Sequence, residues 1–475
     1  MFNWFTYKTI KGVFTVGEKR FKKSWLLMFG LLLIFVLAAC SETPEDEAET
    51  EEESSSPSTT ENGNSGGISG DLEIQYFVGG YGDEWWKSVI EDFKGKYPDV
   101  NVIEHSGPDI NTEMNTRWIS NDPPDVVYID GNGANETQMI SDGQLMDISE
   151  WAKGITMEDG TPLLDSFISP VEEIDGGKIY SLPLVFDTWG MWYDGAWFKE
   201  QGWEAPTDFD SWIASMKQIK EDAGIAPFNT TGQYAQYFQR GVLYPAFAAA
   251  GGEELLNDLS NGNVEAWEGE EVLNVMKKVQ EIVEADLVDS GFAAYSHTQS
   301  QMNFLLHKNA YIPVGFWLPN EMINDTPENF EYSFVPTPMN DSGKPMALVP
   351  DIRTIAIAQE SENVDAAKAF LEFVFTKENA EKFAESTGAI MNLKNVDLSS
   401  NNNVPEFLKG INEMINNPGQ IQIYNRNTPE GEIQDVAVEI TNEIKLQIVE
   451  ILMGRITAEE FVEKMTNKAK ELNGN

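Results

Sequence analysis

Short apolar runs that predict β-strands alternate with segments of helical periodicity through residues 71–475. Residues 71–78 alternate as a strand does, and residues 125–130 form an apolar run typical of a buried parallel strand. Between them, apolar side chains recur at helical spacing over residues 85–93, and Pro98 ends that helix. This alternation predicts an α/β fold with mostly parallel sheets.

Further helices are expected in the second half of the chain, where no internal repeat or domain-scale linker is visible. We expect Thr207 to cap a helix that runs through Ile219. Apolar stripes predict two more helices at residues 364–374 and 436–451, and a capping-box pattern at 457–460 opens the last one. Two lobes built from one uninterrupted chain would fit this arrangement.

The charge and the cysteine content limit the partners that such a chain can bind. It carries 78 acidic and 32 basic side chains, which gives a formal net charge of −46. This acidity excludes nucleic-acid binding, because phosphate recognition needs clustered Lys and Arg. The single cysteine excludes a disulfide framework and a Cys-based zinc cluster. We expect no metal ion and no cofactor.

The first 39 residues have the pattern of a signal peptide. Residues 1–24 carry six basic side chains against one acid, and residues 25–39 form an uncharged apolar run. A basic region followed by a short apolar stretch that ends in small residues is typical of export signals. The run is shorter than the ~20 residues that a membrane span needs. A retained anchor helix or a buried core helix is the alternative.

Cys40 follows Leu37-Ala38-Ala39, and this sequence resembles the bacterial lipobox. The resemblance implies that diacylglycerol alkylates the thiol and that cleavage leaves Cys40 as an acylated, palmitate-type N-terminus. Two acyl chains anchor a protein stably, so we expect a lipid anchor on the extracellular face of the cell membrane, in a bacterium of the Gram-positive type. A lone cysteine that ends an apolar run by chance is the alternative.

Residues 40–70 are expected to be the lipidated cysteine and a disordered acidic tether. The segment after Cys40 contains nine acids, no Lys or Arg and no aromatic residue. It cannot bury enough apolar surface to offset the entropy of ordering, and its charges repel one another and extend it. We expect it to hold the folded body away from the membrane.

Four stretches of the body resemble, in order, the motifs of one family: the extracellular solute-binding proteins of the maltose-binding type, which are sugar receptors of ABC importers. They are residues 93–102 (FKGKYPDVNV), 122–127 (DPPDVV), 182–198 with 201–209, and 366–374 with 386–390. The sequence departs from the family pattern at Asp194, where Asn is usual, at Gly195, where Lys is usual, and at Asn392, near a usual Pro.

The resemblance implies a periplasmic-binding-protein-like fold of two α/β lobes that are joined by a multi-strand hinge and close over a sugar. The chain is expected to cross between the lobes within residues 185–191. The expected lobes are residues 71–184 and 341–395 for the first, and residues 185–340 and 396–475, with the C-terminal helices, for the second.

A sugar receptor needs acids and amides for the hydroxyl edges and flat rings for the apolar faces of its ligand. By the resemblance, Asp83, Asp130 and Asp187 correspond to ligand-binding acids, and Trp317 corresponds to an aromatic platform in the second lobe. Trp189, two residues after Asp187, is a stacking candidate. The alternatives are a helix N-cap for Asp83 and core packing for the tryptophan at the hinge.

The residues themselves suggest further ligand contacts. Trp85 and Trp86 are adjacent on one helix and therefore point in different directions, so one is expected in the core and the other at the cleft. Tyr237 belongs to a polar and aromatic cluster with Tyr234 and Arg240. A second pair, Asp351 and Arg353, lies either in the cleft or in an ordinary ion pair.

We predict a monomeric, lipid-anchored receptor that captures a neutral oligosaccharide or amino sugar and delivers it to an ABC permease, with no enzymatic activity. A lipoprotein that presents its ligand to a membrane sensor is the first alternative. A secreted glycoside hydrolase with two carboxylates is the second. The Gly-x-Ser-x-Gly pattern occurs only at residues 63–67, within the expected tether and not between a strand and a helix, so it is not a nucleophile elbow; residues 130–136 lack the EF-hand calcium spacing.

Overall fold

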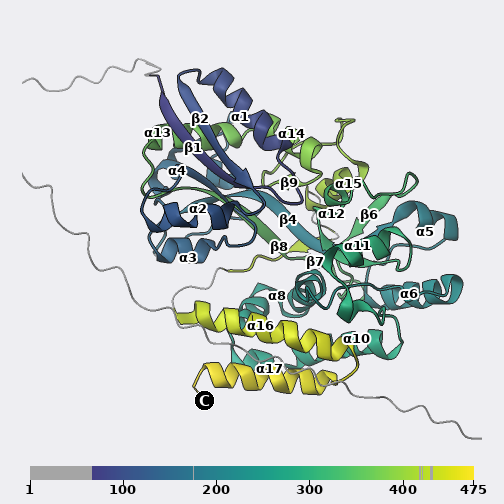
Figure 1. Cartoon of the computed structure of the whole chain (residues 1–475). Coiled ribbons are helices and arrows are strands. Elements are labelled where there is room, and N and C mark those ends of the chain that lie inside the picture. The colour runs from purple at the N-terminus through teal and green to yellow at the C-terminus, as the bar shows by residue number, and fades with distance from the viewer. Residues whose placement is uncertain (1–66, 175, 417–418, 420, 428–431, 475) are drawn as a thin grey trace, which may run out of the picture. The chain divides into compact units, whose positions relative to one another are not determined.

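The computed structural model describes residues 67–474, apart from residues 175, 417–418, 420 and 428–431 (Figure 1). The predicted signal peptide, Cys40 and the tether up to residue 66 lie outside the described residues. Within the part that is described, the helices are too short or too polar to cross a membrane.

A mixed sheet organises the first part of the fold. Its strand order is β2-β1-β3-β8-β4-β5. β1 (Gly70–Phe77) lies between β2 (Val100–Gly107) and β3 (Val126–Ile129) and is parallel to both. β8 (Pro350–Ile357) is antiparallel to β3 on one side and to β4 (Ser181–Asp194) on the other.

The predicted α/β class is confirmed, but the sheet is mixed rather than mostly parallel. The pairings of β4 with β8, β5, β6 and β9 are all antiparallel. An apolar run that is buried on both faces has the same local pattern in either direction, so the sequence does not reveal that β8 returns between β3 and β4.

The longest strand, β4, pairs with different strands along its two halves. Its first half pairs with β8 and with β9 (Ile390–Met391), and its second half pairs with β5 (Ile312–Gly315) and β6 (Tyr332–Val335). Its residues are buried without interruption from Leu182 to Trp192. Continuous burial fits a strand that is covered on both faces.

Helices cover both faces of the first part of the sheet (Figure 1). On one face, α1 (Glu84–Lys96) packs with α13 (Val364–Val374) and α14 (Lys377–Thr387), and their apolar stripes join the core made by β1. On the other face, α2 (Ile110–Ile119) covers β3 and the end of β8. The predicted helices at residues 85–93 and 364–374 are confirmed.

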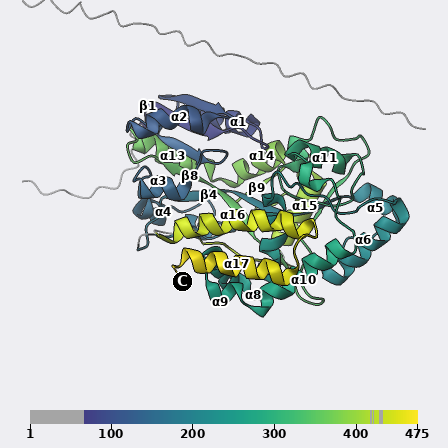
Figure 2. The ribbon, with the colours of Figure 1, turned by 60° about the horizontal axis from the view of Figure 1, so that its bottom comes forward.

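A second core consists mainly of helices. α16 (Glu432–Leu452) and α17 (Ala458–Leu472) lie side by side, with α8 (Tyr244–Ser260) and α10 (Glu270–Glu284) against them (Figures 1 and 2). α6 (Phe209–Ala223) completes this core. The predicted long helix at residues 436–451 is confirmed within α16.

The remaining elements are short. They are α3 (Glu136–Ser141), α4 (Ser149–Gly154), α5 (Gly195–Gln201), α7 (Gln236–Phe238), α9 (Val264–Trp267), α11 (His297–Leu305), α12 (Leu318–Glu321), α15 (Glu406–Asn416), the single turns Leu163–Asp165 and Phe292–Ala294, the π-helical turn η2 (Gln239–Leu243), and the parallel pair β7 (Met346–Leu348) and β10 (Ile421–Ile423).

Two helix caps were predicted, and one of them is wrong by a residue. The cap of α6 is Asp208 rather than Thr207, because Ser211 lies three residues after Asp208 and the two residues form a reciprocal capping box. The box that opens α17 is confirmed: Thr457 Oγ1 accepts from the Glu460 backbone N–H, and Glu460 accepts from that of Thr457.

Replacing Thr457 with Ala should lower the free energy of unfolding by about 1 kcal/mol, because an N–H group of the first turn of α17 loses its acceptor. Urea unfolding followed by circular dichroism measures this change. The exposed Thr298→Ala on α11 is the matched control. Equal effects of the two substitutions would contradict a capping role for Thr457.

Candidate functional site

Three of the predicted acids come together around Arg353, which is itself a predicted site residue. Arg353 Nε is 2.7 Å from Asp130 Oδ1, and Nη1 is 3.0 Å from Asp351 Oδ1. Its Nη2 is 3.8 Å from Asp187 Oδ2. Asp130 directly follows β3, while Asp187 and Asp351 are register neighbours on β4 and β8. The strand register therefore assembles this group, which we call the charge cluster.

A second arginine extends the charge cluster toward the helical core. Arg240 lies on η2, and its Nη1 forms an ion pair with Asp351 Oδ2. The cluster thus links the end of β3, which belongs to the first core, to η2, which packs in the second. The sequence suggested Arg240 only as a neighbour of Tyr237.

Asp187 is the most deeply buried acid of the cluster. Its side chain is fully buried; Oδ1 accepts from the Phe316 backbone N–H at 3.0 Å, and Oδ2 has no hydrogen-bond partner. Burial raises the pKa of Asp187 to about 7, although Arg353 favours the charged form. At Asp351, burial also raises the pKa, but attraction by Arg240 and Arg353 outweighs it and holds the pKa well below its usual range.

Aromatic side chains lie next to the charge cluster. The Trp189 ring meets Trp317 edge-on, with ring centroids 4.6 Å apart, and Tyr237 at 5.5 Å. The Arg240 guanidinium lies 5.9 Å from the Trp189 ring centroid. Trp189 Nε1 is buried without a hydrogen-bond partner. The structure therefore brings the predicted rings of β4, α7 and the loop after β5 into one group.

A histidine that the sequence did not single out holds Tyr237. The Tyr237 hydroxyl is 2.7 Å from His297 Nδ1, and His297 Nε2 is 2.8 Å from Glu321 Oε1. The exposed Tyr234 ring lies edge-on to His297. This contact joins α7 to α11, which are distant in sequence, so no local signal marks it.

The loop after β1 covers the aromatic group. Asn320 Nδ2 donates to the Gly80 carbonyl at 2.5 Å, and a Cβ atom on Gly80 would lie 2.9 Å from that of Trp317. The close approach requires glycine at this position. Tyr81, in the same loop, has a buried hydroxyl with no hydrogen-bond partner. The sequence did not point to Tyr81 or Asn320.

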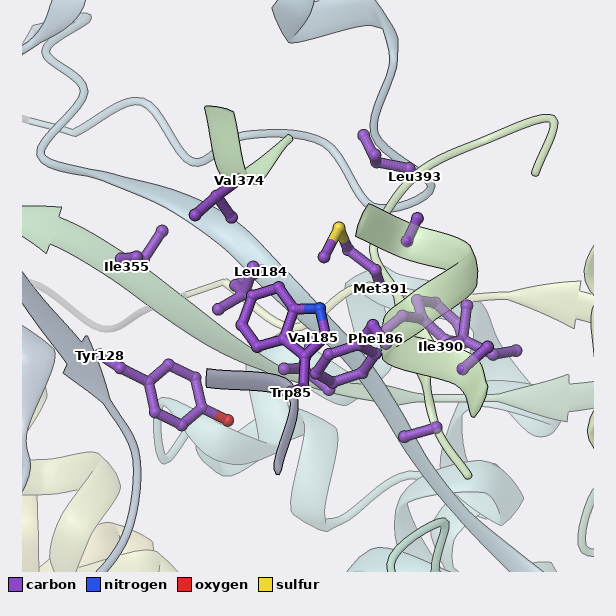
Figure 3. Packing of buried hydrophobic residues seen from close by; sticks show 14 of the residues in the cluster. Trp85, Tyr128, Leu184, Val185, Phe186, Ile355, Val374, Ile390, Met391 and Leu393 are labelled. Atoms are coloured by element: carbon purple, nitrogen blue, oxygen red, sulfur yellow. The ribbon is translucent and has the colours of Figure 1, made fainter. Parts of the chain in front are cut away.

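Trp85 and Trp86 are both buried in the first core. Trp85 packs among Leu184, Val185 and Phe186 of β4 (Figure 3), and its Nε1 donates to the Asn379 carbonyl at 3.1 Å. Trp86 stacks on Tyr76 with ring centroids 4.8 Å apart. Both tryptophans border a cavity of about 10 Å³, the size of a single water.

Asp83 and Asp194 lie at helix ends. Asp83 precedes α1 without capping it and pairs with Lys87 at 2.6 Å on the surface. Asp194 is buried, caps α5, and accepts from His307 at 2.8 Å. At this departure from the family pattern, the aspartate provides two oxygens, one for the helix cap and one for the hydrogen bond with His307.

A strand shared by two cores, with charged and aromatic side chains gathered on it, is the architecture of two-lobed ligand-binding proteins. Residues 79–381 match the family model of the bacterial extracellular solute-binding proteins, and the chain belongs to this family. The resemblance inferred from the four motifs is therefore confirmed.

Curated relatives match over most of their length. The diacetylchitobiose binding protein NgcE of Streptomyces coelicolor is 22% identical over 359 residues, which cover 73% of this chain and 75% of the relative. The melibiose/raffinose/stachyose-binding protein MelE of Bacillus subtilis is 24% identical over 388 residues, which cover 79% of this chain and 82% of the relative.

Solved structures show the same fold. A chitin oligosaccharide binding protein superposes with a TM-score of 0.64 at 19% identity and covers 86% of this chain and 100% of its own. The binding protein RafE in complex with raffinose superposes with a TM-score of 0.62 at 18% identity, covering 84% and 99%. The predicted periplasmic-binding-protein-like fold is confirmed.

The raised pKa of Asp187 predicts a pH-dependent stability. Between about pH 4 and pH 7 the folded protein keeps a proton that the unfolded chain has lost, so the free energy of unfolding falls as the pH rises through this window. The asparagine of the Asp187→Asn variant does not titrate, so that variant lacks this contribution to the pH dependence. Wild type should therefore lose on the order of 3 kcal/mol relative to Asp187→Asn across the window.

Urea unfolding of both proteins between pH 4 and pH 8 measures this difference. The exposed Asp325→Asn is the control and should follow wild type. If wild type and Asp187→Asn ran parallel over the whole range, Asp187 would be charged in the folded protein.

Proposed function

We propose that this protein is the substrate-binding lipoprotein of a carbohydrate ABC import system, and that it captures a neutral oligosaccharide or amino sugar between two lobes and delivers it to the permease. The observation that carries the proposal is the convergence of Asp130, Asp187 and Asp351 with Trp189 and Trp317 on the strands that join the two cores. The ligands named for NgcE, MelE and RafE support the same substrate class.

The unpartnered polar atoms at the cluster suit a polyhydroxylated ligand. Asp187 Oδ2, Trp189 Nε1 and the Tyr81 hydroxyl are buried without hydrogen-bond partners. A buried polar group without a partner costs about 1–3 kcal/mol, and a hydrogen bond to a charged group contributes about 1.5–3 kcal/mol. Sugar hydroxyls both donate and accept, so a sugar can serve all three atoms while its apolar face meets a tryptophan ring.

Ligand entry requires the lobes to separate. The space bordered by Trp189, Arg240 and Asp351 is about 10 Å³, far less than a sugar occupies. We assign residues 71–184 and 341–395 to the first lobe, and residues 185–340 and 396–475 to the second. A ligand that binds the closed arrangement more tightly than the open one shifts the equilibrium toward closure.

The N-terminal segment completes the proposal. A signal peptide at residues 1–39, an acylated Cys40 and an acidic tether up to residue 70 would hold a monomeric receptor on the extracellular face of the membrane. The protein would act by binding alone, without catalysis, and the relatives named above are likewise binding proteins.

Raffinose, stachyose and chitin oligosaccharides form the first ligand panel. One of these neutral sugars should raise the melting temperature, and Trp317→Ala and Asp187→Asn should each weaken its affinity at least tenfold, or about 1.4 kcal/mol. Isothermal titration calorimetry measures the affinities. Trp151→Ala on α4 is the tryptophan control and should leave the affinity unchanged.

Two results would overturn the proposal. One is the absence of binding to any sugar while peptides bind. The other is turnover of a glycoside at enzyme-like rates, which would assign the carboxylates to hydrolysis instead.

Cys40→Ser should abolish acylation, because a hydroxyl cannot replace the thiol in the lipid transfer. Metabolic labelling with an alkyne fatty acid followed by membrane fractionation tests this prediction: wild type should be labelled and sedimented with membranes, and the variant should be neither labelled nor sedimented. Labelling of the variant would place the lipid elsewhere, and an unlabelled wild type would refute the anchor.

A further inference from the structure

A hollow lies on the face of the hinge strands opposite the charge cluster. Side chains alternate along a strand, so Asp351 and Arg353 of β8 point toward Asp187, while Ile352 and Thr354 point to the other face. The hollow on that second face has a volume of about 640 Å³. This volume is within the ~300–1,000 Å³ of small-molecule sites.

Both cores contribute to the walls of this hollow, which we call the rear hollow. Residues 169–174, α3 and the start of β4 come from one side, and the end of α8, residues 425–427 and the start of α16 come from the other. Its lining residues therefore differ from the rings and acids of the proposed sugar site, apart from Asp351 at the boundary.

The rear hollow has an excess of negative charge. Among the described residues its lining carries Glu136, Glu172, Glu173 and Asp351 against the single guanidinium of Arg426. Arg240 and Arg353 already pair with Asp351, and Lys153 Nζ lies 4.0 Å from Glu173 Oε1 in a pair whose side chains are about half exposed. Glu136 accepts hydrogen bonds from the hydroxyls of Ser181 and Thr354, the latter at 2.9 Å, and these contacts hold its carboxyl in the wall.

A buried hydroxyl in the wall has no partner. Ser169 is only 2% exposed and its Oγ makes no hydrogen bond, while its backbone N–H donates to Asn392 Oδ1 at 2.9 Å and fixes its place. Asn425 Oδ1, across the hollow, is also buried without a partner. The Asn425 amide oxygen can only accept, and the Ser169 hydroxyl can accept as well as donate, so a ligand that donates hydrogen bonds would satisfy both groups.

The rest of the wall is aliphatic. The described lining contains no aromatic ring, and its apolar members are Pro170, Val171, Ile174, Pro183, Pro350, Ile352 and Ile433. A surface without rings offers no platform for a sugar face, whereas a methylene chain packs well against Pro, Val and Ile.

We propose that the rear hollow is a second binding site, and that it takes a linear aliphatic polyamine. The ammonium groups donate to the carboxylates of Glu136, Glu172 and Glu173 and to the free acceptors of Ser169 and Asn425. The methylene segments lie along the aliphatic wall. Among its described lining residues, this site shares only Asp351 with the proposed sugar site.

Titration calorimetry of the mature chain, made soluble by Cys40→Ser, with spermidine tests the proposal. One spermidine per chain should bind. Glu136→Gln combined with Glu173→Gln should weaken its affinity at least tenfold. Hexane-1,6-diol, which has a methylene chain but no charge, should not bind.

A control pair separates a site from general attraction to an acidic surface. Glu200→Gln combined with Glu463→Gln removes the same charge from exposed positions elsewhere, and this variant should bind spermidine as wild type does. The double variant Glu172→Gln with Glu173→Gln repeats the test in the hollow. Both positions are exposed, so these substitutions should not disturb folding. Equal weakening by the control pair, or no binding by wild type, would overturn the second site.

Asp187→Asn and Trp317→Ala distinguish this proposal from the proposed function. Both variants should keep wild-type affinity for spermidine while they lose sugar affinity. If they abolished spermidine binding, the polyamine would occupy the sugar site and the rear hollow would be refuted. If no sugar bound but spermidine binding remained sensitive to Glu136 and Glu173, the proposed function would fail and the second site would stand.

Discussion

The hydrogen-bond register of β4 places the central acid and the central ring of the candidate site, Asp187 and Trp189. One pairing sets Asp187 opposite Asp351 of β8, and another sets Trp189 opposite Gly315 of β5. Residues two apart share a face of a strand, so an acid and a ring point into the same space. A slip of one residue would turn both to the other face. Gly190 enforces the register, because a Cβ atom there would lie 2.4 Å from the Phe334 ring.

Burying the charge cluster costs free energy, and accurate placement of its charged groups is needed to offset that cost. Removing carboxylates and guanidiniums from water carries a desolvation penalty that ion pairing repays only when the groups are well placed. Arg353 pairs closely with Asp130 and Asp351 but stays 3.8 Å from Asp187. Asp187 therefore keeps one oxygen without a hydrogen bond, and burial raises its pKa, so the cluster contains both satisfied and unsatisfied acids.

The sequence predicted those features of the structure that depend on residues close together in the chain. The periodicity of α1, α13 and α16 and the capping box of α17 depend on residues a few positions apart, and the sequence predicted them. The family resemblance also pointed to Asp130 and Asp187, two of the three acids that meet at Arg353. The insertion of β8 could not be predicted in the same way, because Val126 pairs with Ile357, far along the chain.

The surroundings of individual side chains could not be predicted from the sequence either. Asp351 and Arg353 were expected to be either cleft groups or an ion pair, and they form an ion pair within a larger cluster. One of Trp85 and Trp86 was expected at the cleft, but both are buried, their rings meet edge-on with centroids 4.9 Å apart, and the covering loop and α14 enclose both. The sequence did not single out His297, because its partners Tyr237 and Glu321 come from other helices.

The placement of β8 also fixes the order in which the chain can fold. β3 and β4 are synthesised early, but the strand that lies between them begins only at Pro350. Until it arrives, both early strands have an unpaired edge, and the first core also lacks α13 and α14. Contacts between such distant segments form slowly. The first sheet can therefore close only after most of the chain has been made, and its two halves depend on a strand that is encoded far from both.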